Sequence, residues 1–388
     1  MTRVPGWLRR APHPRGARLR RRSRPLALGA PAIAILVLAA GRWHAAPRPA
    51  ARPAPAELPA LDALPAAQVR ADPEEGRLVI SLPPVDLPAA AHGHIPMTRL
   101  PLYQAIIPVD ASLYAARVEM VDARGRRLPT ALLHHFNLSD PGRRELFLPI
   151  GLHILAASKE TPELRVPGLV FGLPLARGQR LITSAMVHNP TSRAYRGVRV
   201  QLVLDYREPG RIFPLYEAFP WVMDVMFPIG QQPGGSKAFD LPPGRSSRSW
   251  DASPAVPGRI VGLGGHLHDF GVALELKDVT DGTVLWRGEP IRDSTGQVLQ
   301  IPTKMFYGWR GIGTRVYPEH RYRLTVFYDN PTGRVLKNGG MGAVAGLFIP
   351  DDDADWPAVD TTDADYRQDL LDTMNPGGPV MMMEHGAH

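Results

Sequence analysis

Residues 197–206 read GVRVQLVLDY, and this stretch gives the clearest indication of the fold. Apolar residues occupy every second position, namely Val198, Val200, Leu202, Leu204 and Tyr206. Side chains of a β-strand point alternately to its two faces, so this period of two predicts a strand with one buried and one solvated face.

The same alternation recurs on both sides of this stretch, at residues 78–82, 272–276 and 322–328, with Gly, Pro, Asn and Asp between the segments. The 42 prolines argue against long helices. We therefore expect an all-β body of two antiparallel β-sandwich domains in tandem. A Pro-Gly turn within residues 205–211 (DYREPGR) separates them, which predicts a first domain at 75–206 and a second at 207–350.

The N-terminal region has the composition of an export segment. The first 44 positions hold ten arginines and no acidic residue. Nine of these arginines precede the uncharged run LALGAPAIAILVLAAG at 26–41. This predicts a basic cytoplasmic tail at 1–25, a signal anchor or signal peptide at 26–43, and a Pro/Ala-rich linker at 44–74. The segment is either an uncleaved membrane anchor or a cleaved signal. In both cases we expect the body to be extracytoplasmic.

Charge and cysteine content exclude several classes of function. Without the ten N-terminal arginines the formal net charge of +8 becomes −2, so the body has no basic excess for binding nucleic acid. The absence of cysteine excludes disulfides, thiolate metal sites and a cysteine nucleophile. Any metal must be held by His, Met or carboxylates. The last segment, 351–388, is predicted to be an acidic and then Met/His-containing tail, and no sequence-level repeat is evident.

Two pairs of histidines are candidates for metal ligands. His266 and His268, in GGHLHDFG, lie two residues apart before a predicted strand, so both imidazoles can face one ion. His134 and His135, in LLHHFNL, are adjacent and would point to opposite faces unless the strand twists or ends there. The alternatives are two polar residues at a strand end and hydrogen-bonded core histidines, respectively.

Single residues add to these pairs. His188, in SAMVHNP, ends an apolar run, and Met341 lies in the Gly-rich approach NGGMG. A lone residue of either kind is more often structural, but His and Met together favour copper over zinc because thioether sulfur is a soft ligand. Further His and Met residues have structural alternatives, as loop, core or tail residues: His92, His94 and Met97; His153; and Met381, Met382, Met383, His385 and His388.

The order His-His, His, His-x-His, Met resembles the copper type II ascorbate-dependent monooxygenases, the family of peptidylglycine α-hydroxylating monooxygenase and dopamine β-monooxygenase. The local motifs HHFNL, MVHNP and HLHDFG are similar to those of the family, and the resemblance covers roughly residues 75–350. It implies two jelly-roll-like domains with two copper ions per chain. His134, His135 and His188 (the first set) would hold the copper that stores an electron. His266, His268 and Met341 (the second set) would hold the catalytic copper, where O2 and an external reductant act as co-substrates.

The sequence departs from the family at positions that bind its peptide substrate. Ala343 and Ala345 stand where a substrate-binding Asn and Tyr are expected, and Gly264 stands in place of an Arg. The resemblance thus implies an extracytoplasmic copper monooxygenase with an unidentified small-molecule or lipidic substrate and an unnamed electron donor. A non-catalytic copper storage or transfer protein and a structural surface protein are the alternative hypotheses.

Overall fold

The computed structural model describes residues 61–90, 97–158, 163–210, 212–227, 238–293, 297–308 and 311–374. The chain divides into two compact units, residues 1–51 and 52–388, and every described residue belongs to the second. The expected cytoplasmic tail, the signal segment, His92, His94 and the Met/His tail lie outside the described residues. Within the described ranges, no helix has the length and apolar character needed to span a membrane.

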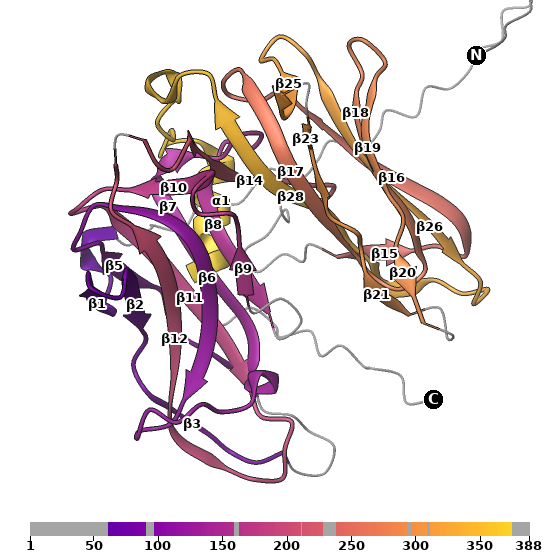
Figure 1. Cartoon of the computed structure of the whole chain (residues 1–388). Helices are drawn as coiled ribbons and strands as arrows, with labels where there is room; N and C mark the ends of the chain where they lie inside the picture. The colour runs from indigo at the N-terminus through magenta and orange to yellow at the C-terminus, as the bar shows by residue number, and fades with distance from the viewer. Residues whose placement is uncertain are drawn as a thin grey trace, which may run out of the picture. The chain divides into compact units, whose positions relative to one another are not determined.

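The described residues fold mostly as strands, as the sequence predicted, and they contain one α-helix, α1 (Ala364–Met374). Three short 3₁₀ helices accompany it: η1 (Leu61–Ala63), η2 (Thr130–Leu132) and η3 (Asp353–Asp355). The predicted strand at 197–206 lies within β12 (Tyr195–Arg207), and its alternate apolar residues are all fully buried. The period of two in the sequence therefore identifies the core-facing side chains correctly. Figure 1 shows β12 as one of several long strands that lie side by side.

Two sheets form the first sandwich. One has the order β1 (Gln68–Asp72), β2 (Arg77–Ser81), β12, β6 (Ala111–Val121), β10 (Phe171–Leu175), β13 (Tyr216–Glu217), with β3 (Val85–Leu87) beside β12 and β9 (Glu163–Arg165) beside β6. The other has the order β4 (Met97–Arg99), β11 (Arg180–His188), β7 (Leu133–Arg144), β8 (Gly151–Ser158), with β5 (Tyr103–Ile106) also beside β11.

The second sandwich is built in the same way. One sheet has the order β14 (Phe219–Asp224), β28 (Gly342–Pro350), β17 (Gly258–Leu267), β22 (Lys304–Met305), with β25 (Thr314–Val316) beside β17. The other has the order β16 (Gly244–Ala252), β26 (Tyr322–Asn330), β18 (Gly271–Asp278), β19 (Val284–Gly288). Short pairs complete it: β15 (Phe239–Leu241) with β27 (Leu336–Gly340), β20 (Ile291–Arg292) with β21 (Val298–Gln300), and β23 (Tyr307–Gly308) with β24 (Gly311–Ile312).

Both sandwiches are wound in the same order. The central strands of the first form sheets β2–β12–β6–β10 and β5–β11–β7–β8, and those of the second form β14–β28–β17–β25 and β16–β26–β18–β19. Numbered along the chain within each sandwich, both give the sheet orders 1-8-3-6 and 2-7-4-5. This is the eight-stranded jelly roll.

A repeated asparagine supports this internal duplication. Asn189 follows β11 and Asn330 ends β26, and each makes the same five hydrogen bonds. The amide nitrogen donates to three backbone oxygens, those of Leu87, Pro88 and Arg193 or those of Leu241, Pro242 and Arg334. The motifs DLP (86–88, 240–242) and NPTxR (189–193, 330–334) thus occur once per sandwich, a repeat that the sequence analysis missed.

A buried glutamate links the two sandwiches. The side chain of Glu145, which is 0% exposed, follows β7 in the first sandwich. Its carboxylate accepts hydrogen bonds from three backbone N–H groups: Leu146 at 3.2 Å, His153 at 3.0 Å and Val222 of β14 at 3.0 Å. Because β14 belongs to the second sandwich, one carboxylate satisfies donors from both. A buried carboxylate is tolerated only with such partners.

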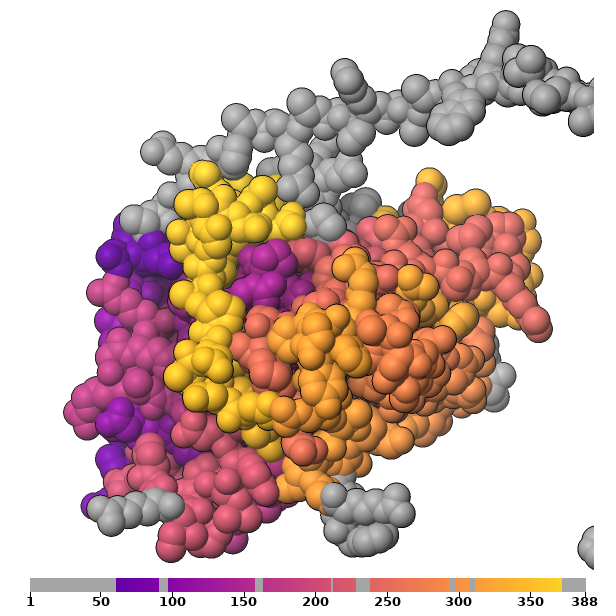
Figure 2. Space-filling model, turned by 90° about the horizontal axis from the view of Figure 1, so that it is seen from above, coloured from indigo at the N-terminus to yellow at the C-terminus, as the bar shows by residue number. Residues whose placement is uncertain are grey.

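After the second sandwich the chain returns to the first. The Trp356 indole N–H donates to the Arg144 oxygen at 2.7 Å, and Arg143 forms an ion pair with Asp353. Tyr366 and Leu370 of α1 pack in one apolar cluster with residues of the first sandwich, Leu64, Leu102 and Ile182. Figure 2 shows this C-terminal segment, in yellow, lying over the indigo and magenta part of the surface.

The structure shifts the predicted boundaries. The first sandwich begins with β1 at Gln68, inside the expected linker, because a short edge strand can form from a sequence without strong alternation. Its last strand, β13, pairs with β10 beyond the expected boundary at 206/207, and the second sandwich starts at Phe219. Residues 351–374 are packed structure and not a tail, because Trp356 and Tyr366 supply buried apolar contacts.

Replacing Glu145 by Gln is expected to lower the free energy of unfolding by roughly 1–3 kcal/mol, because the amide NH2 would face a backbone N–H that needs an acceptor. Urea unfolding followed by tryptophan fluorescence measures the change. The exposed Glu163→Gln is the matched control, with an expected change within about 0.5 kcal/mol. Equal effects of the two substitutions would contradict the proposed role of Glu145.

Candidate metal centres

His134 and His135 are adjacent in β7, yet their ring centroids lie 4.2 Å apart. The reason is a β-bulge. Met186 of β11 pairs with His135 and Val187 pairs with Leu133, so His134 is an extra residue without a partner on β11. A bulge re-aims a side chain that regular alternation would send to the opposite face. From the sequence, both rings can face one ion only if the strand departs from regular geometry at this pair. The bulge is such a departure.

His188 joins this pair from the end of β11. Its ring centroid is 5.3 Å from that of His134, and its Nε2 atom lies 2.7 Å from the backbone oxygen of Ala131 in η2. A carbonyl oxygen only accepts, so Nε2 carries the proton in this contact and donates it. Metal-binding histidines commonly donate their second N–H to a carbonyl in this way. The five hydrogen bonds of Asn189 fix the backbone directly after His188.

The first set lies on the outward face of its sheet. The alternate residues Leu133, Phe136 and Val187 are fully buried in the core, whereas His135 is exposed and His134 and His188 are half-buried. An ion can therefore reach the rings from solvent. The structure thus brings all three histidines of the first set together.

The second set is positioned by the pairing of β17 with β28. His266 pairs with Ala343 and Leu267 with Gly342, so extending the register by one residue places Met341 opposite His268. Residues two apart on a strand share a face, which puts His266, His268 and Met341 on one side of the sheet. The two imidazole centroids are 5.4 Å apart, with an interplanar angle of 87°.

The hydroxyl of Tyr328 ties the two segments of the second set together. It accepts hydrogen bonds from the backbone N–H groups of His268 (3.2 Å) and Met341 (2.9 Å), and it donates to the backbone oxygen of Met341. The Tyr328 side chain is 2% exposed and its ring packs edge-on against Phe239. The sequence analysis used this tyrosine only as a core residue; nothing in the strand pattern indicates its second role.

The second set also favours neutral imidazole, the form that binds metals. Burial lowers the pKa of His268 from its ordinary value, and the neighbouring His266 lowers it further. Hydrogen bonds with the backbone of Asn338 and Gly339 oppose this shift and hold the ring. Phe270, two residues after His268, and Asn338, three residues before Met341, have φ values of 65° and 52°. Non-glycine residues adopt this left-handed region at a cost in free energy.

A third group of possible ligands lies elsewhere. Among the described residues, Asp278, Asp281 and His320 form the group of three His, Asp or Glu whose ligand atoms all lie within 4.8 Å of one another. The first set is more open than this, so its rings must turn to close on an ion. Asp278 already accepts hydrogen bonds from Thr280, Asp281 and His320, which gives this third group a structural role in a turn.

The sheet beside the second set is lined with small residues. Gly264 pairs with Ala345, and Ala343 lies between His266 on one side and Asp224 on the other. Asp224, which is 3% exposed, is the acidic residue that pairs with Ala343, and the sequence analysis did not single it out. The floor next to His266 carries no bulky side chain at these three positions.

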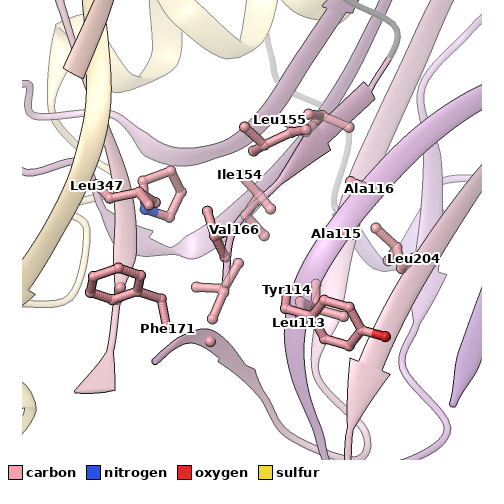
Figure 3. Close-up of a pocket in the computed structure, with 15 residues that line it drawn as sticks. Leu113, Tyr114, Ala115, Ala116, Ile154, Leu155, Val166, Phe171, Leu204 and Leu347 are labelled. Atoms are coloured by element: carbon pink, nitrogen blue, oxygen red, sulfur yellow. The ribbon is translucent and has the colours of Figure 1, made fainter. Parts of the chain in front are cut away.

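An apolar pocket lies in another part of the structure (Figure 3). It has a volume of about 60 Å³, and its lining includes Leu113, Tyr114, Ile154 and Phe171 but no residue of either set. Ligand sites usually enclose about 300–1,000 Å³. This pocket is smaller than that range, and neither ligand set lines it.

Two further expectations have different outcomes. His153 was expected to be a satisfied core residue, but its Nδ1 makes no hydrogen bond within the described residues and lies 3.8 Å from Glu145. The ring lies between two carboxylates, with its Nε2 atom 4.0 Å from Asp369. Because the side chain is 20% exposed, His153 is partly solvated and is not a core residue. Met97, which the sequence grouped with His92 and His94, pairs in β4 with His188 of the first set.

Replacing Tyr328 by Phe removes one acceptor from two buried N–H groups. We expect the free energy of unfolding to fall by roughly 1–3 kcal/mol and the amide hydrogens of His268 and Met341 to exchange faster. Hydrogen exchange by mass spectrometry measures the second effect. Tyr216→Phe, at a residue 38% exposed, is the control and should change neither quantity. Unaltered exchange at His268 and Met341 would rule out the bridging role.

The pair Asp278–His320 predicts a pH-dependent contribution to stability. A hydrogen bond to Asp278 raises the pKa of His320 from its ordinary value. The stabilisation is therefore complete below the unfolded pKa of about 6.5 and is lost as the pH rises through the raised value. Unfolding of the wild type and of His320→Asn, measured from pH 5 to 9, should differ most at the acidic end. A difference that grows with pH would contradict this assignment.

Comparison with models of protein families and with curated proteins finds no match. Among solved structures, the chain is similar to a protein in the structure of Sulfolobus Turreted Icosahedral Virus, with 12% identity, 72% of this chain and 96% of the other covered, and a TM-score of 0.31. The Faustovirus major capsid protein is 7% identical, with 74% of this chain and 88% of the other covered and a TM-score of 0.26. PNGF-II is 10% identical, with 74% of this chain and 62% of the other covered and a TM-score of 0.26. Similarity at this level assigns no function.

Proposed function

We propose that this chain is an extracytoplasmic copper-dependent monooxygenase that inserts one oxygen atom of O2 into a C–H bond of a small-molecule or lipidic substrate. The observation that carries the proposal is the convergence of two ligand sets, one in each jelly roll, whose donors are only imidazole nitrogen and thioether sulfur. Such donors favour copper. The family resemblance in the order of the six residues supports the same metal.

The residues fit copper at both sets. The Nε2 atom of His188 donates to Ala131, as metal-binding histidines commonly do to a carbonyl, and burial favours the neutral form of His268. Copper bound at the two sets would supply one electron each, so that one atom of O2 enters the C–H bond and the other leaves as water with two protons. An external reductant must return both electrons.

The remaining residues hold and shape the second set. Tyr328 keeps the backbones of His268 and Met341 together, so the imidazole and the thioether project from neighbouring points before metal enters. Gly264, Ala343 and Ala345 place no charge and no side-chain hydrogen-bond donor beside His266, and the methyl group of Thr303 lies over Gly264. An apolar C–H substrate suits this floor better than a peptide carboxylate.

The same alanines favour the alternative of copper storage or transfer without turnover, because a substrate site needs polar groups that fix orientation. Turnover separates the two functions. A purely structural surface protein is the third hypothesis, and the clustering of three imidazoles from β7 and β11 argues against it. Export and membrane attachment through residues 26–43 belong to the proposal as the sequence predicts them.

The proposal predicts two copper ions per purified full-length chain and O2 consumption with ascorbate as the reductant. His266→Ala should leave one copper and no O2 consumption, and Met341→Leu should slow O2 consumption about tenfold to hundredfold with the fold intact. Met305→Leu, an exposed methionine in β22, is the control and should change neither.

Atomic absorption and an oxygen electrode give the two readouts, and circular dichroism checks the fold. Two bound coppers without O2 consumption under any reductant would favour storage or transfer. Less than one copper per chain would exclude both copper functions.

A further inference from the structure

Two methionines face the first set from neighbouring strands. In the pairing of β4 with β11, Met97 lies directly opposite His188. In the pairing of β11 with β7, Met186 lies directly opposite His135. Met186 and His188 are two residues apart on β11, so all four side chains share one face of the sheet. The bulge adds His134 to the same group.

The register places both sulfur atoms within reach of the imidazoles. Directly opposite residues of an antiparallel pair have Cβ atoms about 4.5–5.5 Å apart, and a methionine side chain has three rotatable bonds beyond its backbone. Met97 can therefore swing its thioether toward His188, and Met186 can do so toward His135. No backbone movement is required for either.

Burial argues against a packing role for these methionines. The residues that alternate with them on β11, Ala185 and Val187, are 3% and 0% exposed and form the core, whereas Met97 and Met186 are only half-buried on the outward face. Thioethers in that position contribute little to the core. They lie beside the three-imidazole group instead, opposite His188 and His135.

The same face presents no carboxylate next to the first set. Arg99 lies opposite Met186, and Ser184 lies opposite Asn137. Cu(II) prefers oxygen and nitrogen donors, whereas thioether sulfur selects Cu(I). The two thioethers therefore add soft donors to the three imidazoles.

We propose that Met97 and Met186 are thioether ligands of the first metal site and that this site takes Cu(I). The inference rests on the proposed binding of copper by the first set and extends it, since the sequence pattern assigns only three histidines there. The two sets then both combine imidazole and thioether, with the sulfur supplied from a neighbouring strand in each.

The test uses the full-length chain with the second set removed by His266→Ala and Met341→Leu, so that only the first set remains. Competition with a chromophoric chelator measures Cu(I) affinity, and X-ray absorption of the Cu(I)-loaded chain detects sulfur among the nearest neighbours. In this background, Met97→Leu with Met186→Leu should weaken Cu(I) binding about tenfold or more and remove the sulfur signal, while Cu(II) binding changes less than about threefold.

Met305→Leu in the same background is the matched control, because it makes the same chemical change at an exposed site in the second sandwich. Leucine conserves the volume of methionine, and thermal unfolding verifies that each variant folds. The single variants then assign the sulfur to Met97, to Met186 or to both. The inference would be overturned if neither the single variants nor the double variant lost Cu(I) affinity or the sulfur signal.

The outcomes separate this inference from the proposed function. If the background chain binds one Cu(I) through nitrogen alone and the double variant binds equally well, the thioether ligands are excluded and the copper site of the first set stands. If the background chain binds no copper, the first set is not a copper site and the proposed function fails with it.

Discussion

Every strand in a jelly roll must pair its backbone with a neighbour, and this requirement decides which side chains face the core and which face outward. In this protein both candidate sites lie on outward faces, where strand pairing sets the neighbours. The second set follows the regular ladder, because His266 of β17 pairs with Ala343 of β28 and Met341 directly precedes β28. The first set needs a break in the ladder, the extra residue His134 in β7.

The two jelly rolls are copies in backbone and not in chemistry. Asn189 and Asn330 make equivalent hydrogen-bond networks at equivalent positions, so the two copies share this feature of the fold. The residue before this asparagine is His188 in the first sandwich and Asp329 in the second. A candidate ligand in one copy is thus a surface carboxylate in the other. In the second set, the ligand Met341 comes instead from the segment directly before the last strand, β28. The sites therefore diverged on a common scaffold.

Glu145 adds a polar link between the two sandwiches, whose buried apolar residues form one continuous cluster. Its carboxylate accepts N–H groups from a loop of the first sandwich and from Val222 of the second, at a depth where water cannot substitute. The returning C-terminal segment adds Trp356 and Tyr366 against the first sandwich. These contacts and the candidate chemistry involve different residues.

The sequence by itself determined the class of fold and the core-facing residues, because a period of two is a local property that survives in any antiparallel sheet. It also identified His266 and His268 as a pair sharing one face, since that too follows from spacing along one strand. The tertiary structure alone decided what comes from other strands: the bulge at His134, the tie by Tyr328, and the position of Met97 opposite His188. Register between strands distant in sequence fixes these contacts, and no local pattern encodes register.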